Sequence, residues 1–307
     1  MMKTSPSKLV LVDADGLLYI AGAIGETRYY DVTVEDSSGE LKSFHKDSAA
    51  DVKEWLAEHK DHTLVEKELV TIPGPLDHCL QVAKQKLKEI QKRYGKQLEV
   101  YVKGDGTNWR DDIATVVPYK ANRTAPKPYW LEDVRQYLIH TWGAIEISGK
   151  EADDQIATRA YEASKEYVVC SPDKDLDQIP GTHWNYKKSV EYEISSYEAQ
   201  FFFWQQVLSG DPADNIKGCW KVGEGKAMAF IEERADLVGG DEALLWQDIV
   251  ETYEASKELP GCPYADRQAE EVALENARLV WMQTEHGRLW TPPGADLEYV
   301  EEMSIEF

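Results

Sequence analysis

Carboxylates recur in this sequence directly after short apolar runs of the kind that form buried strands. Asp13 closes the run 8–12, Asp105 follows the run 98–102, and Asp173 follows the run 167–171. Because the carboxyl ends of parallel strands share one edge of a sheet, these acids are expected to converge in one crevice. The complete set is Asp13, Asp15, Asp105, Glu151, Asp153, Asp154, Asp173, Asp175, Asp211 and Asp214.

So many carboxylates in one crevice cannot all ionise unless something offsets their mutual repulsion. Hard divalent cations such as Mg²⁺ or Mn²⁺ take oxygen ligands, and two of them side by side would polarise a phosphoryl group and activate water. The alternative is that each acid is only a helix N-cap. Caps do not require pairs such as Asp153–Asp154 or Asp173–Asp175. Asp15 is the member that fits a cap best.

A basic segment lies between two of the acidic motifs. It contains Tyr119, Lys120 and Arg123, with Arg110 before it and Lys127 after it. Lysine and arginine contact phosphates, and tyrosine stacks on a terminal base. The alternative is a solvated basic loop, which the position between acidic motifs disfavours.

A glycine-rich turn precedes a predicted helix that begins at Gly225. Glycine lets a backbone approach phosphate closely, and a helix N-terminus favours anions. An ordinary surface turn is the alternative, and the G-x-x-x-x-G-K-[ST] pattern of a P-loop is absent. The candidate phosphate contacts of this turn are Lys217, Gly218, Lys221, Gly223, Gly225 and Lys226.

The elements that position these residues alternate between strand and helix. The expected strands are 8–12, 98–102, 144–147 and 167–171, and the expected helices of this part are 17–23, 49–59, 76–94, 129–142 and 153–163. This order predicts an α/β fold with a mostly parallel central sheet flanked by helices. A hairpin is expected over 28–44, turning at 36–39. Helices at 195–209, 225–233, 242–257 and 267–284 predict a helix-rich C-terminal part.

Two domains are therefore expected. The first is an α/β core over 1–194 with a long loop rich in glycine, proline and bases at about 104–128, and the second is a helical region over 195–307 with the glycine-rich turn at about 209–233. The four cysteines show no C-x-x-C pair, which favours reduced thiols over a zinc site or disulfides. No apolar run approaches the ~20 residues of a membrane span, and residues 1–8 do not resemble a signal peptide. A cytoplasmic, monomeric protein is expected.

The formal charge of −22 argues against a nucleic-acid partner, because phosphate binding normally requires a basic surface. The objection weakens when nine of the acids are assigned to metal ions, which leaves −13. It weakens further because bases concentrate at 110–127 and 217–226. Binding that requires divalent metal and low-to-moderate salt is the corresponding expectation.

The ordered motifs resemble those of a known family. V-D-A-D-G, G-D-G-T-N-W-R, Y-K-A-N-R, E-A-D-D, S-P-D-K-D-L and G-D-P-A-D-N-I-K-G resemble the flap endonuclease/5′→3′ exonuclease family over residues 8–233. The match is nearest to the bacteriophage-encoded 5′→3′ exonucleases and the 5′-nuclease domain of bacterial DNA polymerase I. This resemblance implies a PIN-like core, a two-metal mechanism on DNA 5′ ends or 5′ flaps, and a role in DNA replication, in the cytoplasm of a bacterial host if the chain is phage-encoded.

The resemblance also implies roles for individual residues. Lys120 and Arg123 match the family's catalytic lysine and its accompanying arginine, and Tyr119 would help to unstack the terminal base pair. The resemblance makes 1–194 the nuclease core, about 104–128 its arch segment and about 209–233 the duplex-binding element, in which 218–226 often holds K⁺. The first metal would be surrounded by Asp13, Asp105, Glu151, Asp153 and Asp173, and the second by Asp175, Asp211 and Asp214. Asp153 or Asp173 would be shared, and Asp154 would be a further ligand, directly or through water.

Other interpretations remain open at this point. The run Leu-Val-Asp-Ala-Asp also resembles the nucleophile motif of haloacid-dehalogenase-type phosphatases, with Asp13 attacking phosphate. A non-catalytic DNA-structure-binding protein on the same fold and a PIN-type ribonuclease are further alternatives. The sequence does not decide between exonuclease and flap-cutting modes, nor whether the RNA strand of a hybrid is cut, and it leaves the role of residues 26–75 open.

Overall fold

The computed structural model describes residues 8–164, 166–238 and 240–295. The chain divides into two compact units, which we describe separately. Unit 1 contains residues 1–16, 88–125 and 142–307, and unit 2 contains residues 17–87 and 126–141. This division does not follow the boundary expected after residue 194, because the C-terminal helices belong to the same unit as the central sheet.

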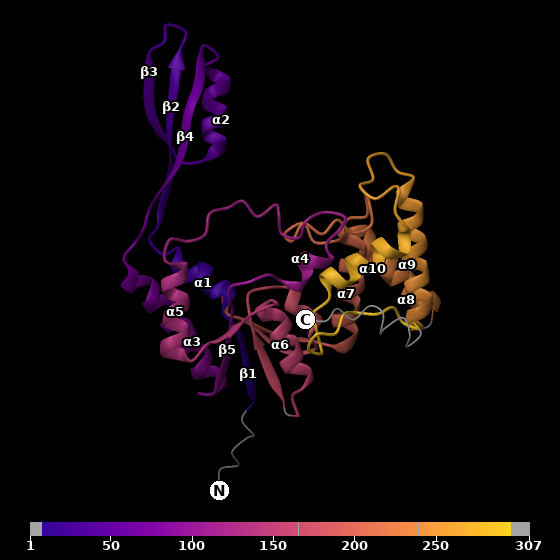
Figure 1. Cartoon of the computed structure of the whole chain (residues 1–307). Coiled ribbons are helices and arrows are strands. Elements are labelled where there is room, and N and C mark those ends of the chain that lie inside the picture. The colour runs from indigo at the N-terminus through magenta and orange to yellow at the C-terminus, as the bar shows by residue number, and fades with distance from the viewer. Residues whose placement is uncertain (1–7, 165, 239, 296–307) are drawn as a thin grey trace. The chain divides into compact units, whose positions relative to one another are not determined.

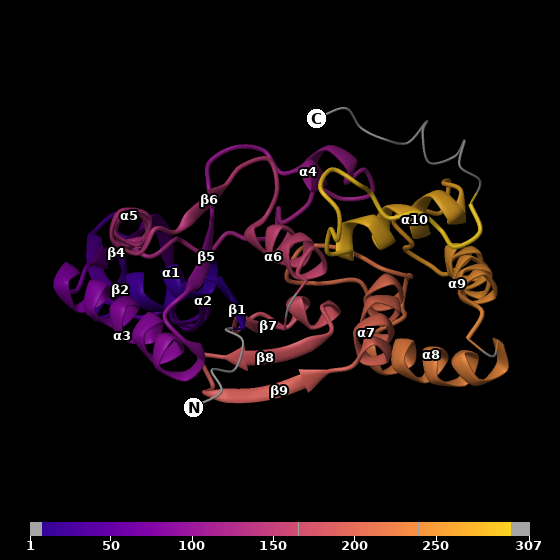
Figure 2. The ribbon, with the colours of Figure 1, turned by 90° about the horizontal axis from the view of Figure 1, so that it is seen from below.

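Unit 1 is built on a six-stranded sheet (Figure 2). Its first five strands run parallel, and the last pairs antiparallel with its neighbour. Apolar runs make the central strands, and all five residues of the strand 9–13 are buried. The strand order is β6 (Ile145–Ile147), β5 (Leu98–Lys103), β1 (Leu9–Asp13), β7 (Tyr167–Cys170), β8 (Gly181–Asn185) and β9 (Val190–Ile194).

The helix α6 (Ala152–Tyr161) covers one face of this sheet, where Ile156 and Ala157 pack with Leu11 and Val169. A second core lies among the later helices and contains Trp204, Trp246 and Tyr253. The helices of unit 1 other than α6 are α4 (Trp109–Ile113), the 3₁₀ helix η1 (Asp175–Gln178), α7 (Ser196–Ser209), α8 (Glu224–Val238), α9 (Glu242–Lys257) and α10 (Ala269–Val280).

Unit 2 contains α1 (Asp15–Gly22), most of α3 (Leu76–Tyr94), α5 (Leu131–Trp142) and a separate three-stranded antiparallel sheet (Figure 1). The strand order is β3 (Leu41–Lys46), β2 (Thr27–Asp36) and β4 (His62–Ile72). Helix α2 (Ala49–Glu58) packs on one face, where Val52 meets Val32 and Val34. The β2–β3 turn is fixed by Asp36, whose side chain accepts the N–H groups of Ser38 and Glu40.

The expected mostly parallel α/β fold is confirmed, and so is the hairpin at 28–44. Three strands were missed. β4 was not expected because its outward residues are charged and exposed, and β8 and β9 are five-residue strands near the rim of the sheet. No helix in the described part of the chain combines the length and apolarity that a membrane crossing requires.

Candidate active site

The carboxyl edge of the unit 1 sheet begins with Asp13 at the end of β1. Its side chain is 5% exposed, and one oxygen accepts a hydrogen bond from Ser171 Oγ at 2.6 Å. The other oxygen accepts the N–H of Asp15 at 2.9 Å. Burial, and then the negative charges of Asp15 and Asp173, raise the pKa of Asp13 to about 7. Such a carboxylate stays ionised at neutral pH only with a compensating cation nearby.

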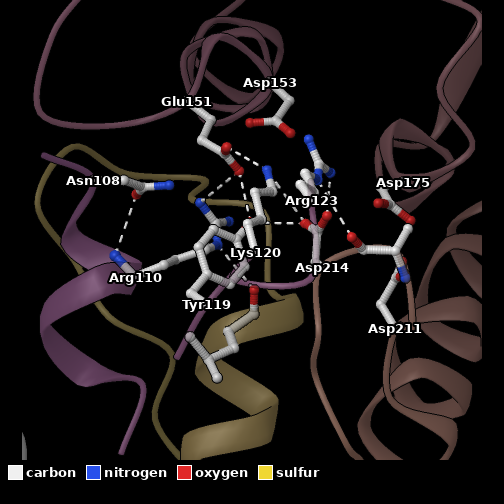
Figure 3. A network of polar contacts seen from close by, with 12 residues as sticks. Asn108, Arg110, Tyr119, Lys120, Arg123, Glu151, Asp153, Asp175, Asp211 and Asp214 are labelled. Carbon is white, nitrogen blue, oxygen red and sulfur yellow. Dashed lines mark hydrogen bonds and ion pairs between the residues drawn. The ribbon is translucent and has the colours of Figure 1, made fainter. Parts of the chain in front are cut away.

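Glu151 lies at the centre of the cluster, as the residue before α6. It is 6% exposed, contacts Lys120 Nζ, and lies 3.5 Å from Lys103 Nζ. The hydroxyl of Tyr119 lies 2.8 Å from Glu151 Oε2 and 2.7 Å from Asp214 Oδ2, so it bridges two acids (Figure 3). Burial opposes ionisation here, but the cations Lys120, Arg110 and Lys103 outweigh it and lower the pKa of Glu151.

Asp214 holds the basic segment in place. Its backbone carbonyl accepts the N–H of Lys120 at 2.8 Å, and its carboxylate contacts Arg123 Nη2 and lies 3.3 Å from Lys120 Nζ. Lys120 has a positive φ of 53°, a conformation that a non-glycine residue rarely adopts without support. Two adjacent cations are thereby directed into the carboxylates, as Figure 3 shows.

A second group of acids lies beside Asp214. Asp175 accepts a hydrogen bond from Gln206 Nε2 at 2.8 Å, and Asp211 accepts the N–H of Ala213 at 2.7 Å. Burial, and then the charges of Asp173 and Asp211, raise the pKa of Asp175 to about 7. Burial and the charges of Glu151 and Asp154 raise the pKa of Asp153 well above its ordinary value.

These donors fit hard divalent cations, because they are all carboxylate oxygens and three of them have raised pKa values from burial and mutual repulsion. Within the described residues, no three acidic, histidine or cysteine side chains form a closed metal-binding group. The positive charges of Lys120, Arg123 and Arg110 instead lie against Glu151, Asp214 and Asp154.

Arg110 and Asp154 do not lie where the sequence predicted. Arg110 is 1% exposed and forms a bidentate ion pair with Asp154. Its guanidinium is therefore not accessible to DNA. Asp154 is fully buried and also accepts hydrogen bonds from Trp109 Nε1 and the N–H of Gln283. Its negative charge is therefore already balanced by the Arg110 guanidinium, and it has no exposed surface, which disfavours a metal-ligand role.

Three further residues depart from expectation. Tyr119 is 8% exposed and lies between acids, so its ring is not available to stack on a base. Asp105 is exposed after β5, so it does not lie among the buried acids of the cluster. Lys127 belongs to unit 2, whereas the carboxylates belong to unit 1. Asp15 begins α1 and accepts the N–H of Lys103 at 2.8 Å, which connects the end of β5 to the start of α1.

The turn between α7 and α8 carries the other predicted residues. Gly218 and Gly210 both have positive φ, and a Cβ on either would overlap the backbone of the other segment. The N–H of Gly218 donates to Asn276 Oδ1 at 2.9 Å. Lys217, Lys221 and Lys226 are exposed, and Gly223 has open space around it, so this turn presents backbone and lysines to solvent.

Sequence reasoning missed several residues that position the site. Ser171 and Gln206 hydrogen-bond Asp13 and Asp175. Ser171 is the serine of the acidic motif S-P-D, so the sequence could have indicated it. No feature of the sequence distinguishes Gln206 or Glu275. Glu275 of α10 is 8% exposed and accepts the N–H groups of Thr115 and Val116, both at 2.8 Å.

The overall fold is similar to that of solved bacteriophage T5 nucleases. A bacteriophage T5 5′-exonuclease structure with bound divalent zinc aligns over 90% of both chains at a TM-score of 0.55 and 17% identity. The flap endonuclease of bacteriophage T5, in a pseudo-enzyme–product complex with DNA and metal ions, aligns over 67% of this chain and 81% of that one, with a TM-score of 0.51 and 20% identity.

Curated relatives give a second line of similarity. The chain is 31% identical over 138 residues to DNA polymerase I of Rhizobium leguminosarum, covering 39% of this chain and 13% of that protein. It is 27% identical over 195 residues to the thermostable DNA polymerase I of Thermus caldophilus, covering 56% of this chain and 22% of that protein. The chain thus spans less than a quarter of either polymerase. No protein-family model matches it.

Proposed function

We propose that this protein is a divalent-metal-dependent 5′ nuclease that hydrolyses phosphodiester bonds of DNA from 5′ ends or at 5′ flaps. The observation that carries the proposal is the cluster in which Lys120 and Arg123 enter a group of buried carboxylates centred on Glu151 and Asp214. Metal-dependent phosphoryl transfer requires carboxylates that hold the metal ions and, next to them, cationic side chains that stabilise the charge on the phosphate. The similarity to the T5 nucleases and to DNA polymerase I supports it.

Two Mg²⁺ or Mn²⁺ ions would be held by two groups of acids. When bound, they would supply Lewis acidity and an activated water. The first group is Asp13, Glu151, Asp153 and Asp173, to which the resemblance adds the exposed Asp105, and the second is Asp175, Asp211 and Asp214. A K⁺ ion on the backbone of the α7–α8 turn belongs to the same proposal.

The remaining work falls to the protein's own side chains. Lys120 and Arg123 would contact the oxygens of the phosphate being transferred and stabilise its charge. Tyr119 holds Glu151 and Asp214 at a fixed separation through its hydroxyl. Lys217, Lys221 and Lys226 would bind the duplex backbone through the α7–α8 turn, and the chain would act as a monomer.

The decisive experiment uses one 5′-labelled DNA duplex in blunt, nicked and 5′-flap forms, with Mg²⁺ and then with EDTA. Cleavage in Mg²⁺ that stops in EDTA is expected. Labelled mononucleotides would indicate exonuclease action, and one excised oligomer would indicate a flap cut. An RNA–DNA hybrid tests action on RNA. Binding without cleavage in any divalent metal would overturn the proposal in favour of a non-catalytic DNA-binding protein.

The phosphatase interpretation is disfavoured by the elements that precede its late acidic pair. Asp211 and Asp214 follow helix α7, whereas that motif requires them after a strand. It also gives no role to Lys120, which lies between Glu151 and Asp214.

A further inference from the structure

The positive charge of this chain is unevenly distributed. The whole sequence has 34 lysines and arginines against 56 acids, whereas residues 84–96 have six bases and one acid. This segment is the second half of α3 and the turn that follows it. The local balance is thus the reverse of the global one, and it is not explained by the carboxylate cluster or by the α7–α8 turn.

Within unit 1, the end of α3 lies against the β8–β9 turn (Figure 2). Ser189 Oγ lies 3.5 Å from Glu89 Oε1, and Arg93 Nε lies 3.1 Å from Glu191 Oε2. The guanidinium of Arg93 also lies over the Trp184 ring at 4.3 Å. These contacts bring the bases of the helix and of the turn onto one surface. We call it the basic surface, and it consists of Lys88, Lys92, Lys187 and Lys188.

The four lysines are held in place at their backbones but remain available at their ammonium groups. The N–H groups of Lys187 and Lys188 both donate to Asn185 Oδ1, at 3.1 and 2.9 Å, which fixes the turn. All four side chains are exposed, and none forms an ion pair with another side chain in the described ranges. Unpaired ammonium groups on a fixed framework suit the phosphates of a polyanion.

The basic surface is close enough to the carboxylate edge and to the α7–α8 turn for one duplex to contact all three. Tyr186, next to the turn, donates its hydroxyl to the backbone oxygen of Asp13 at 2.9 Å, so the turn begins beside the carboxylate edge. Strand β9 and helix α7 connect it to the α7–α8 turn, and their lengths together come to about 40 Å. At ~3.4 Å per base pair, a duplex of about a dozen pairs would span both.

We propose that the basic surface binds the phosphate backbone of duplex DNA, as a second contact besides the α7–α8 turn. The inference rests on the proposed function, because it assumes the same DNA substrate. It accounts for how a chain of net charge −22 retains DNA, because exposed lysines are gathered at two places, the basic surface and the α7–α8 turn. The phosphates meet local positive potential while the carboxylates are neutralised by metal.

The test compares three double variants that each remove two positive charges. K88Q/K92Q and K187Q/K188Q alter the basic surface. K53Q/K60Q is the matched control, since Lys53 and Lys60 are exposed lysines of unit 2. Binding of each protein to a duplex of about 24 base pairs is measured in Ca²⁺ across a series of salt concentrations, and again with a duplex of about 8 base pairs.

Both surface variants are expected to weaken binding of the long duplex roughly five- to thirtyfold at low salt and to reduce the slope of log K against log salt by about one to two. The short duplex should lose less, because it cannot reach both contacts. The control should stay within about twofold of the parent. Affinity and salt slope equal to the control would overturn the inference.

Cleavage of the long duplex by the parent in Mg²⁺ is scored separately. If the parent cleaves DNA but the surface variants match the control, only the basic surface is wrong. If the parent binds without cleaving and the surface variants bind less, the basic surface stands and the nuclease proposal falls. A parent that binds no DNA overturns both.

Discussion

Arg110 and Asp154 form a two-pronged ion pair that is closed off from solvent, with Nη1–Oδ2 at 2.6 Å and Nη2–Oδ1 at 2.8 Å. Arg110 also donates to the backbone oxygens of Leu279 and Trp281. One side chain thus joins α4, the first turn of α6 and the end of α10. Since α6 begins directly after Glu151, this pair fixes the helix end on which the candidate site is built.

Arg110→Ala should therefore destabilise the fold strongly. It leaves the Asp154 carboxylate buried without its cation, which costs about 3–5 kcal/mol. Urea denaturation would measure this loss in the free energy of unfolding. The matched control is Arg288→Ala, whose exposed pair with Glu285 contributes about 0–1 kcal/mol. Equal losses in the free energy of unfolding for the two variants would show that the buried ion pair contributes no more to stability than the exposed one.

Lys120→Ala should separate chemistry from binding. Lys120 contacts Glu151 and Asp214 at the centre of the acids, where its charge would act on the transferring phosphate. We expect single-turnover cleavage to fall by about 10²–10³-fold with duplex affinity within about threefold. The opposite pattern is expected for Lys217→Ala, which alters an exposed lysine of the α7–α8 turn. Duplex affinity should fall while the single-turnover rate stays near that of the parent. A fall in that rate as well would indicate that the turn also orients the DNA. Equal loss of rate and affinity in Lys120→Ala would refute its role.

How much of this could be read from the sequence depends on the range of the interactions involved. The strand 9–13 and the acids after it follow from a short apolar run and its end, so β1 and Asp13 were predictable. The buried position of Arg110 was not predictable, because it depends on contacts with distant residues. Asp154 lies 44 residues away in the sequence and Leu279 lies 169 residues away. A basic residue in a loop reads as a phosphate contact until its buried partner is known.

The same limit applies to Tyr119. Its place beside Lys120 suggested an exposed ring, but the ring belongs to the buried core of the C-terminal helices while its hydroxyl bridges two acids. An aromatic residue serves either purpose, and only the three-dimensional packing decides. β4 was missed for the converse reason, since a strand with mostly exposed residues lacks the apolar alternation by which strands are recognised.

Asp175→Asn should stabilise the metal-free protein. Burial and the charges of Asp173 and Asp211 oppose ionisation of Asp175, so removing its charge at pH 8 in EDTA relieves repulsion. We expect a gain on the order of 1–2 kcal/mol in the free energy of unfolding, discounted for partial exposure. Asp266→Asn, at an exposed loop position, is the control and should change little.

Adding Mg²⁺ should reverse the order of stability, so that the parent becomes more stable than the Asp175→Asn variant. The parent gains stability by binding metal in the folded state, and the variant gains less because it has lost a ligand charge. Thermal melts in EDTA and in Mg²⁺ measure both effects. A parent whose melting temperature is insensitive to Mg²⁺ would contradict a metal role for these acids.

Glu275→Gln should slow catalysis without touching the site directly. Glu275 accepts the N–H groups of Thr115 and Val116 and lies 3.2 Å from Arg267 Nη1, so α10 anchors the chain that leads to Tyr119 and Lys120. Glutamine keeps one acceptor oxygen but loses the charge, and alanine loses both. We therefore expect kcat to fall by about 3–10-fold in Glu275→Gln and further in Glu275→Ala, with KM changed little, because the displaced lysine acts in the transition state.

The matched control is Glu271→Gln, an exposed position on the same helix. It should leave kcat within about twofold of the parent. Folding losses alone would lower the active fraction equally at all substrate concentrations, so active-site titration by tight DNA binding corrects for them. A graded loss of kcat that follows the order glutamate, glutamine, alanine after this correction supports positioning. A loss that disappears on correction would reduce Glu275 to a purely structural residue.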